Sequence, residues 1–217
     1  MTVKVPLKET ALNAERIARI GREVQDACPG FDADGFVQSV MADLPRLELS
    51  ARIARTSEGL HEYLPVTGPD ALDVLLRSLP PTPEAAGVTN DFGLHIYSPH
   101  SDYVSRYLRS AEHLDQALAA LARMTGYFSA ELPVRHFLAD FPDETMKAVD
   151  AWTHDADYRV RRLASEARSS GSASPASRAP GRSGACWRHR RTPTGACGWP
   201  PTTCWEGWCG TSAPSTW

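Results

Sequence analysis

Hydrophobic residues in the first 166 positions recur every three or four residues, which is the spacing of one face of an α-helix. Four helices are predicted in the first half of this region: over about 14–27, after Asp32, over about 46–63 and from Gly68. Asn13 and Asp32 stand directly before the first two, where a short polar side chain can accept hydrogen bonds from the free backbone N–H groups. The first half is therefore predicted to be helical.

The second half continues the helical pattern after a proline-rich break. Residues 80–83 read Pro-Pro-Thr-Pro, which ends one helix and begins a linker. The apolar stretch 92–97 is compatible with either a short helix or an extended segment. Further helices are predicted over about 101–110, over about 111–127, after a cap at Ser129, from Pro142 and from near Tyr158. No useful run of strand-like alternation is present, so the fold class is predicted as all-α.

The last three predicted helices form a unit of roughly 35–40 residues, the size of a HEAT-type helical repeat. Such units stack into an α-solenoid because each repeat buries its apolar face against its neighbours. A turn at His154-Asp155-Ala156-Asp157 precedes the final helix, in which Val160, Leu163 and Ala164 are predicted to face the core. The same helix carries three basic residues that are predicted to line a concave surface: Arg159, Arg161 and Arg162.

The composition changes abruptly after Glu166. Residues 167–217 contain no Val, Ile, Leu, Met, Phe, Tyr, Lys, Asp, Asn or Gln, yet they hold four of the five Cys and five of the six Trp. A folded core needs aliphatic side chains, so this segment is predicted to lack regular structure. Most of its residue types have G/C-rich codons, which suggests translation in the wrong frame. Two parts are therefore expected: a helical-repeat domain over 1–166 and a low-complexity tail over 167–217.

The codons of the tail allow a test of this interpretation. Reading Arg191–Cys204 from the third base of each codon permits Asp-Ala-Asp-Gly-Arg-Val-Arg-Leu-Ala, which matches the in-frame segment that begins at Asp155. This match predicts that a further repeat is encoded in the alternative frame. Two other interpretations stay open: a genuine disordered Ser/Pro/Arg tail, and an Arg/Trp/Cys tail that acts as a binding module.

Charge and cysteine usage narrow the function classes. Residues 1–166 hold 17 basic and 25 acidic residues, a net charge of −8, which weakly disfavours nonspecific nucleic-acid binding but leaves room for a local basic stripe. Cys28 is the one cysteine of this part, and neither the cysteines nor the histidines have the spacing of metal ligands. No leader-like segment and no 18-residue apolar run occur, so a cytoplasmic monomer without membrane contact is expected.

Three segments closely resemble the AlkC branch of HEAT-like DNA alkylation-repair glycosylases. They are Phe128-Ser-Ala-Glu-Leu-Pro-Val-Arg-His-Phe-Leu138, Trp152-Thr-His-Asp-Ala-Asp157 and Val160-Arg-Arg-Leu-Ala-Ser-Glu166. The strong part of the resemblance covers 128–166, and a weaker part covers about 1–127. It implies a right-handed stack of helix pairs that removes positively charged, N3-alkylated bases of the 3-methyladenine class from double-stranded DNA. It also implies that no metal and no organic cofactor takes part.

The resemblance assigns the chemistry to carboxylates. Glu131 and Glu166 match the family's acidic pair and lie 35 residues apart, about one repeat, so stacked helices could present both to one groove. An N3-alkylated purine already carries positive charge, and a fixed carboxylate can stabilise the positive charge that develops on the deoxyribose. Arg162, one helical turn before Glu166, could hold a phosphate or orient Glu166. Arg161 and Arg159 are the other candidate DNA contacts.

Several observations favour plainer roles. Glu131 near a helix start is favourable to the helix dipole whatever its function, and Glu166 could simply pair with Arg162. Trp152 occupies an apolar helix position, which predicts a core residue. In the family a tryptophan follows the second glutamate by eight residues, where this chain has Ser174. We therefore expect that activity is lost in this chain. The alternative function is a non-catalytic helical-repeat scaffold that binds nucleic acid or protein.

Overall fold

The computed structural model describes residues 5–171, and within that range the chain is helical. The described helices are α1 (Leu7–Ala11), α2 (Ala14–Ala27), α3 (Ala33–Asp43), α4 (Leu49–Tyr63), α5 (Gly68–Ser78), α6 (Ser98–Tyr107), α7 (Leu114–Met124), α8 (Glu131–Asp140), α9 (Pro142–Trp152) and α10 (Tyr158–Gly171). Two short 3₁₀ helices, η1 (Leu44–Arg46) and η2 (His95–Tyr97), precede α4 and α6. The one β-type pairing among these residues is an isolated bridge between Gly93 and Phe128. The all-α prediction is confirmed.

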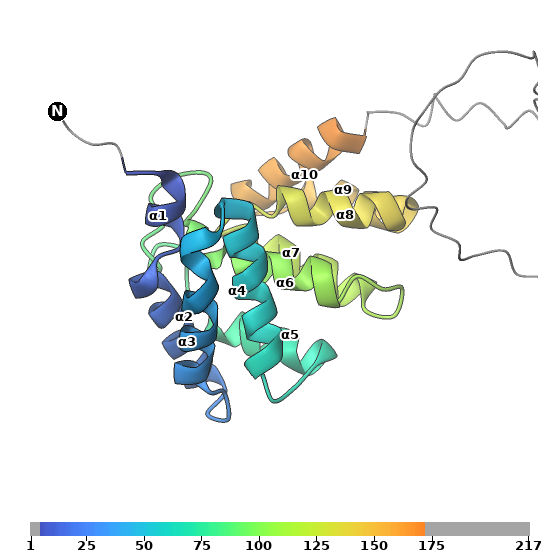
Figure 1. Cartoon of the computed structure of the whole chain (residues 1–217). Helices are drawn as coiled ribbons and strands as arrows, with labels where there is room; N and C mark the ends of the chain where they lie inside the picture. The colour runs from blue at the N-terminus through green and yellow to red at the C-terminus, as the bar shows by residue number, and fades with distance from the viewer. Residues whose placement is uncertain (1–4, 172–217) are drawn as a thin grey trace, which may run out of the picture. The chain divides into compact units, whose positions relative to one another are not determined.

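Most helices pack against a neighbour in the chain, and from α4 onward each helix also packs against the one two positions further along. The helices α4, α6, α8 and α10 contact one another in succession, and α2, α5, α7 and α9 form a second succession beside them. Figure 1 shows this progression from the blue N-terminal helices through the green pair α6 and α7 to α10 in orange. Two parallel rows of helices that share one continuous core are the arrangement of an α-solenoid, which confirms the predicted fold.

Two of the three predicted helix caps are present. The side chain of Asn13 accepts a hydrogen bond from the backbone N–H of Arg16 at 3.0 Å, and that of Asp32 accepts one from Gly35 at 2.9 Å. The cap predicted at Ser129 is wrong, because α8 begins one residue later and Ala130 occupies the cap position without a side-chain bond. The Ser129 hydroxyl lies instead against Glu166, so a tertiary contact replaces the local one.

Several helix boundaries differ from those predicted. Pro45 lies in the 3₁₀ turn η1, and α4 begins at Leu49 rather than near residue 46. Pro99 occupies the first turn of α6, where its fixed φ is compatible with a helix start, so α6 begins at Ser98. Both alternatives for 92–97 occur, since Gly93 pairs in the bridge and His95–Tyr97 form η2.

The final helix buries the face that its sequence predicts. Val160 is 6% exposed, and Leu163 and Ala164 are fully buried in the core, which Trp152 also joins. The helix continues five residues beyond Glu166, to Gly171, and Ala167 is fully buried. From residue 172 onward the predicted tail lies outside the described residues, as does the alternative-frame repeat at 191–204.

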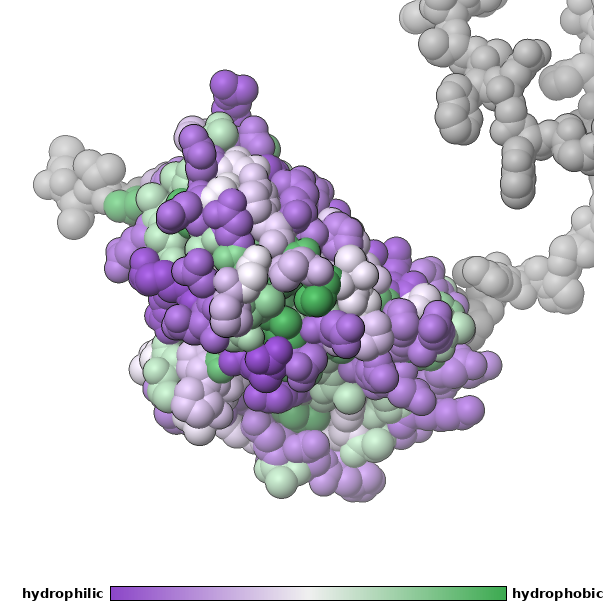
Figure 2. Space-filling model, turned by 90° about the horizontal axis from the view of Figure 1, so that it is seen from below, coloured by the Kyte–Doolittle hydropathy of each residue, from purple (hydrophilic) through white to green (hydrophobic). Residues whose placement is uncertain are grey.

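Polar residues cover most of the face shown in Figure 2, where they surround a smaller central area of hydrophobic residues. Within residues 5–171 the structure has no helix with both the length and the apolar character that crossing a bilayer requires. Most large hydrophobic side chains in this range belong to the core, and the exposed exceptions are Val5, Leu7, Phe92, Leu132 and Tyr158.

His100 on α6 is a fully buried titratable residue within this core. Its Nε2 lies 3.3 Å from the Ser78 hydroxyl oxygen, and burial lowers the pKa of the ring from 6.5 to about 4. The neutral ring is therefore favoured in the folded state. Its contribution to stability is full above pH 6.5 and is lost as pH falls toward 4, since the unfolded chain then binds a proton that the folded chain does not.

We expect the free energy of unfolding to fall by about 2 kcal/mol between pH 7 and pH 5, because roughly 1.4 kcal/mol is lost for each pH unit below the unfolded pKa of 6.5. Urea unfolding of the 217-residue chain at the two pH values measures the change. The matched variant His100→Phe removes the titrating ring at similar volume and should flatten the dependence. An equal pH dependence in the two proteins would contradict the assignment to His100.

Candidate functional site

A tightly held loop, residues 90–94, lies against the start of α8. The Asn90 side chain accepts hydrogen bonds from the backbone N–H groups of Phe92 and Gly93, both at 2.9 Å. Across the bridge, the Leu94 N–H donates to the Tyr127 carbonyl at 2.7 Å, and the Ser129 N–H donates to the Phe92 carbonyl at 2.9 Å. Gly93 has φ of +84°, and a Cβ there would lie 2.0 Å from the Tyr127 carbonyl oxygen. Only glycine fits this position, so the backbone that presents Phe92 has a defined conformation.

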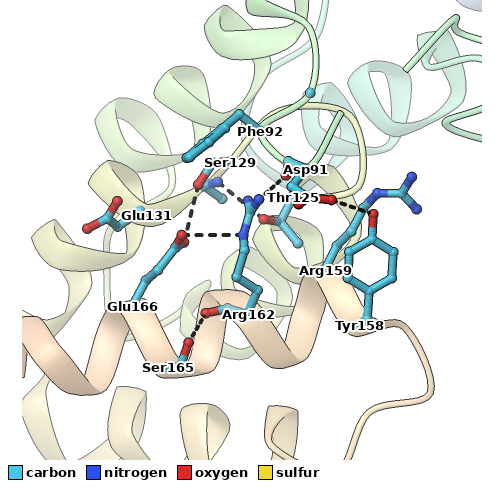
Figure 3. Close-up of polar contacts among 12 residues, drawn as sticks. Asp91, Phe92, Thr125, Ser129, Glu131, Tyr158, Arg159, Arg162, Ser165 and Glu166 are labelled. Carbon is cyan, nitrogen blue, oxygen red and sulfur yellow. Dashed lines mark hydrogen bonds and ion pairs between the residues drawn. The ribbon is translucent and has the colours of Figure 1, made fainter. Parts of the chain in front are cut away.

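Glu166 and Arg162 lie at the junction of this loop, α8 and α10. Glu166 Oε1 is 3.3 Å from Arg162 Nε, and Glu166 Oε2 accepts a hydrogen bond from the Ser129 hydroxyl at 3.4 Å. The Arg162 guanidinium also donates to the Asp91 carbonyl and lies 5.2 Å from the centre of the Phe92 ring. Figure 3 shows Glu166 reaching toward Ser129 and Arg162 from α10. The Glu166 carboxylate is thus held from two sides.

Glu131 is the first residue of α8, two positions after Ser129. Its carboxylate forms an ion pair with Arg135, one turn along the same helix. In Figure 3 the Glu131 carboxylate points away from Arg162 and Glu166. Its side chain is 36% exposed, compared with 22% for Glu166. The structure therefore places the two carboxylates on neighbouring helices, with Glu166 the more enclosed.

The other two predicted arginines have different surroundings. Arg159 is 13% exposed and forms an ion pair with Glu84 at 3.3 Å. Beside it the Tyr158 hydroxyl donates to the Asp91 carboxylate at 3.1 Å. Arg161 is exposed and donates to the carbonyls of Asp155 and Ala156, in the turn before α10. Arg159 therefore serves to attach α10 to the 84–91 segment, whereas Arg161 leaves its charge at the surface.

Sequence reasoning missed the loop contribution to this site. Asp91 and Phe92 are about 70 residues from α10, and no periodicity connects them with it. The one sequence feature that could have indicated an ordered loop here is the Asn90…Gly93 spacing, which is typical of a tight turn. Among residues 5–171, no three His, Cys, Asp or Glu side chains are grouped in a way that could hold a metal ion.

Comparison with known proteins finds similarity in structure to one protein and in sequence to another. The structure matches that of the Pseudomonas fluorescens alkylpurine DNA glycosylase AlkC bound to DNA containing an abasic site analogue, with a TM-score of 0.65 and 33% identity. That match covers 76% of this chain and 43% of AlkC. The sequence is also 29% identical over 155 residues to YhaZ of Bacillus subtilis strain 168, a protein described as uncharacterized.

The chain spans about two fifths of the length of both relatives, since the YhaZ match covers 71% of this chain and 40% of YhaZ. No family model matches the sequence. The likeness to AlkC extends to both fold and sequence over the helical part, in agreement with the resemblance that residues 128–166 indicate.

Proposed function

We propose that this chain, which resembles the AlkC-type DNA alkylation-repair glycosylases in sequence and fold, belongs to a glycosylase lineage that releases positively charged N3-alkylated bases from double-stranded DNA. The observation that carries the proposal is the position of Glu166. Its carboxylate is held between Arg162 and Ser129, on the helix next to the one that begins with Glu131. A fixed, partly enclosed carboxylate is the group that a cationic transition state requires.

Carboxylates suit this substrate class because the alkylated base is already a good leaving group. As the glycosidic bond breaks, the electron pair goes to the cationic base and positive charge develops at the sugar carbon. Glu166 would stabilise that charge, or orient the water that attacks it. Glu131, more exposed and first in its helix, would act on the same centre or on the water. Neither step requires a general acid to protonate the leaving base.

The arginines would divide between positioning and phosphate contact. Arg162 contacts Asp91, Phe92 and Glu166, which supports a positioning role for it. Arg161 retains an exposed guanidinium on the same helix and is the better candidate for a DNA phosphate. Arg159 is largely buried and forms an ion pair with Glu84. It would hold the 84–91 segment against α10, and it would reach DNA only if that ion pair opened.

The second candidate function is binding without catalysis. A helical-repeat scaffold would use the same surface to bind nucleic acid or protein without any reaction. Release of 3-methyladenine from alkylated duplex DNA separates the two. We expect release by a protein in which the frame after Glu166 is restored, and little or none by the 217-residue chain, because its composition departs from that of a helical repeat there. Absence of release by the restored protein would favour the scaffold.

The substitution Arg162→Ala in the frame-restored protein is expected to slow single-turnover excision by roughly tenfold, the effect of losing one charged hydrogen bond. The salt dependence of DNA binding should stay unchanged, since Arg162 orients Glu166 rather than a phosphate. Arg161→Ala, the matched control on the same helix, should reduce the slope of log affinity against log salt by about one. If Arg161→Ala slows excision and Arg162→Ala reduces the salt slope instead, then Arg161 orients Glu166 and Arg162 contacts the phosphate.

A further inference from the structure

Phe92 is an exposed aromatic side chain on a well-anchored loop. It is 66% exposed, more than any other large hydrophobic residue identified at the surface of residues 5–171. An isolated exposed hydrophobic residue is common in proteins. Here, however, the peptide groups on both sides of Phe92 are hydrogen-bonded, through Asn90 and across the bridge to Ser129.

The ring is also placed beside the candidate carboxylates. The Arg162 guanidinium lies 5.2 Å from the ring centre, and the same arginine is paired with Glu166. The Phe92 carbonyl accepts from Ser129, whose hydroxyl donates to Glu166. Phe92 is thus joined to Glu166 by two separate routes of contact. Figure 3 shows the ring projecting over this group of side chains.

Helix α10 secures the loop as well as carrying Glu166. Arg162 donates to the Asp91 carbonyl, Tyr158 donates to the Asp91 carboxylate, and the neighbouring Arg159 pairs with Glu84. These contacts fix the backbone that carries the ring relative to the carboxylate, so binding through Phe92 would require little ordering of the loop. A preorganised aromatic face next to a cation is well suited to a nucleobase, because every base has a π-face.

We propose that Phe92 stacks on a nucleobase bordering the damaged nucleotide and so positions the lesion against Glu166. The inference rests on the proposed function, and it assigns Phe92 a positioning role rather than a catalytic one. The occupant is a base of duplex DNA made accessible where damage weakens stacking and pairing. Arg162 would then have two functions, since it orients the carboxylate and contacts the ring that positions the substrate.

The test uses the 217-residue chain and a duplex that carries an abasic analogue flanked by 2-aminopurine, whose fluorescence responds to stacking. Phe92→Ala should weaken binding to this duplex by roughly tenfold, the size of one lost aromatic–base stack. It should also abolish the 2-aminopurine response, while binding to undamaged duplex changes much less. Phe92→Trp should retain both the affinity and the response.

Leu7→Ala is the matched control, because Leu7 is 56% exposed on α1 and lies outside the described site. It should behave like the unmodified chain. Thermal unfolding of each variant checks the fold, and the exposed position of Phe92 predicts a small shift. Unchanged affinity and fluorescence response in Phe92→Ala would overturn the stacking role and leave the proposed function standing. If the unmodified chain shows no preference for damaged over undamaged duplex, the stacking role fails, whereas the proposed function is decided separately by release of 3-methyladenine from the frame-restored protein.

Discussion

Replacing Glu166 or Glu131 by glutamine in a frame-restored protein is expected to slow the release of 3-methyladenine by roughly a hundredfold, with the larger loss for Glu166. The change removes the negative charge at nearly constant shape. A lost electrostatic contact to the transition state costs on the order of 3 kcal/mol in a site that excludes water. Glu166 should show the larger effect because its side chain is 22% exposed, compared with 36% for Glu131.

Single-turnover assays on alkylated duplex DNA measure this effect apart from product release. Glu144→Gln is the matched control, since Glu144 is an exposed first-turn glutamate of the next helix, α9. It should leave the rate unchanged, and circular dichroism should show the same helical content in all three variants. Unmodified rates in both site variants would remove Glu131 and Glu166 from the mechanism.

Substituting Arg52 by methionine is expected to reduce the free energy of unfolding by about 3–5 kcal/mol, because it removes four hydrogen bonds from a charged donor, each worth about 1 kcal/mol. Arg52 on α4 is 2% exposed, and its guanidinium bonds both to the N-terminal segment and to the turn before α4. Its guanidinium donates to the carbonyls of Leu47, Lys8 and Leu12 and to the Glu9 carboxylate, and this bond holds the pKa of Glu9 below its ordinary value of 4.5. Methionine would leave those acceptors without their donor.

Urea unfolding of the 217-residue chain, followed by far-ultraviolet circular dichroism, provides the midpoint and slope. Arg77→Met is the control, because Arg77 is 54% exposed in an i,i+4 pair with Asp73. Its effect should stay below about 1 kcal/mol, as for other surface ion pairs. A comparable loss in the two variants would show that Arg52 contributes no more than a surface arginine.

Local sequence signals predict much of this architecture correctly. Asn13 and Asp32 cap their helices as expected, and the apolar spacing of Val160 and Leu163 identifies the buried face of α10. These features depend on contacts within one or two helical turns, so they can be read from neighbouring residues. The ion pair between Arg162 and Glu166 has the same origin, since four residues along a helix bring two side chains together.

Contacts between distant segments were decided by the packing of the helices. Ser129 was predicted to cap α8, yet its hydroxyl contacts Glu166, 37 residues away. The partners of Arg162 and Arg159 on the 84–92 segment, and the buried position of Arg52, have no counterpart in periodicity.

The sequence by itself determined most of the helices, their buried faces and the one-repeat spacing of Glu131 and Glu166. Only the tertiary structure decided which loop borders those carboxylates. The physical reason is that many residues of similar chemistry could make each long-range contact. The packing of whole helices decides which of these residues makes the contact. By contrast, the partner in an i,i+4 contact is fixed by its position in the same helix.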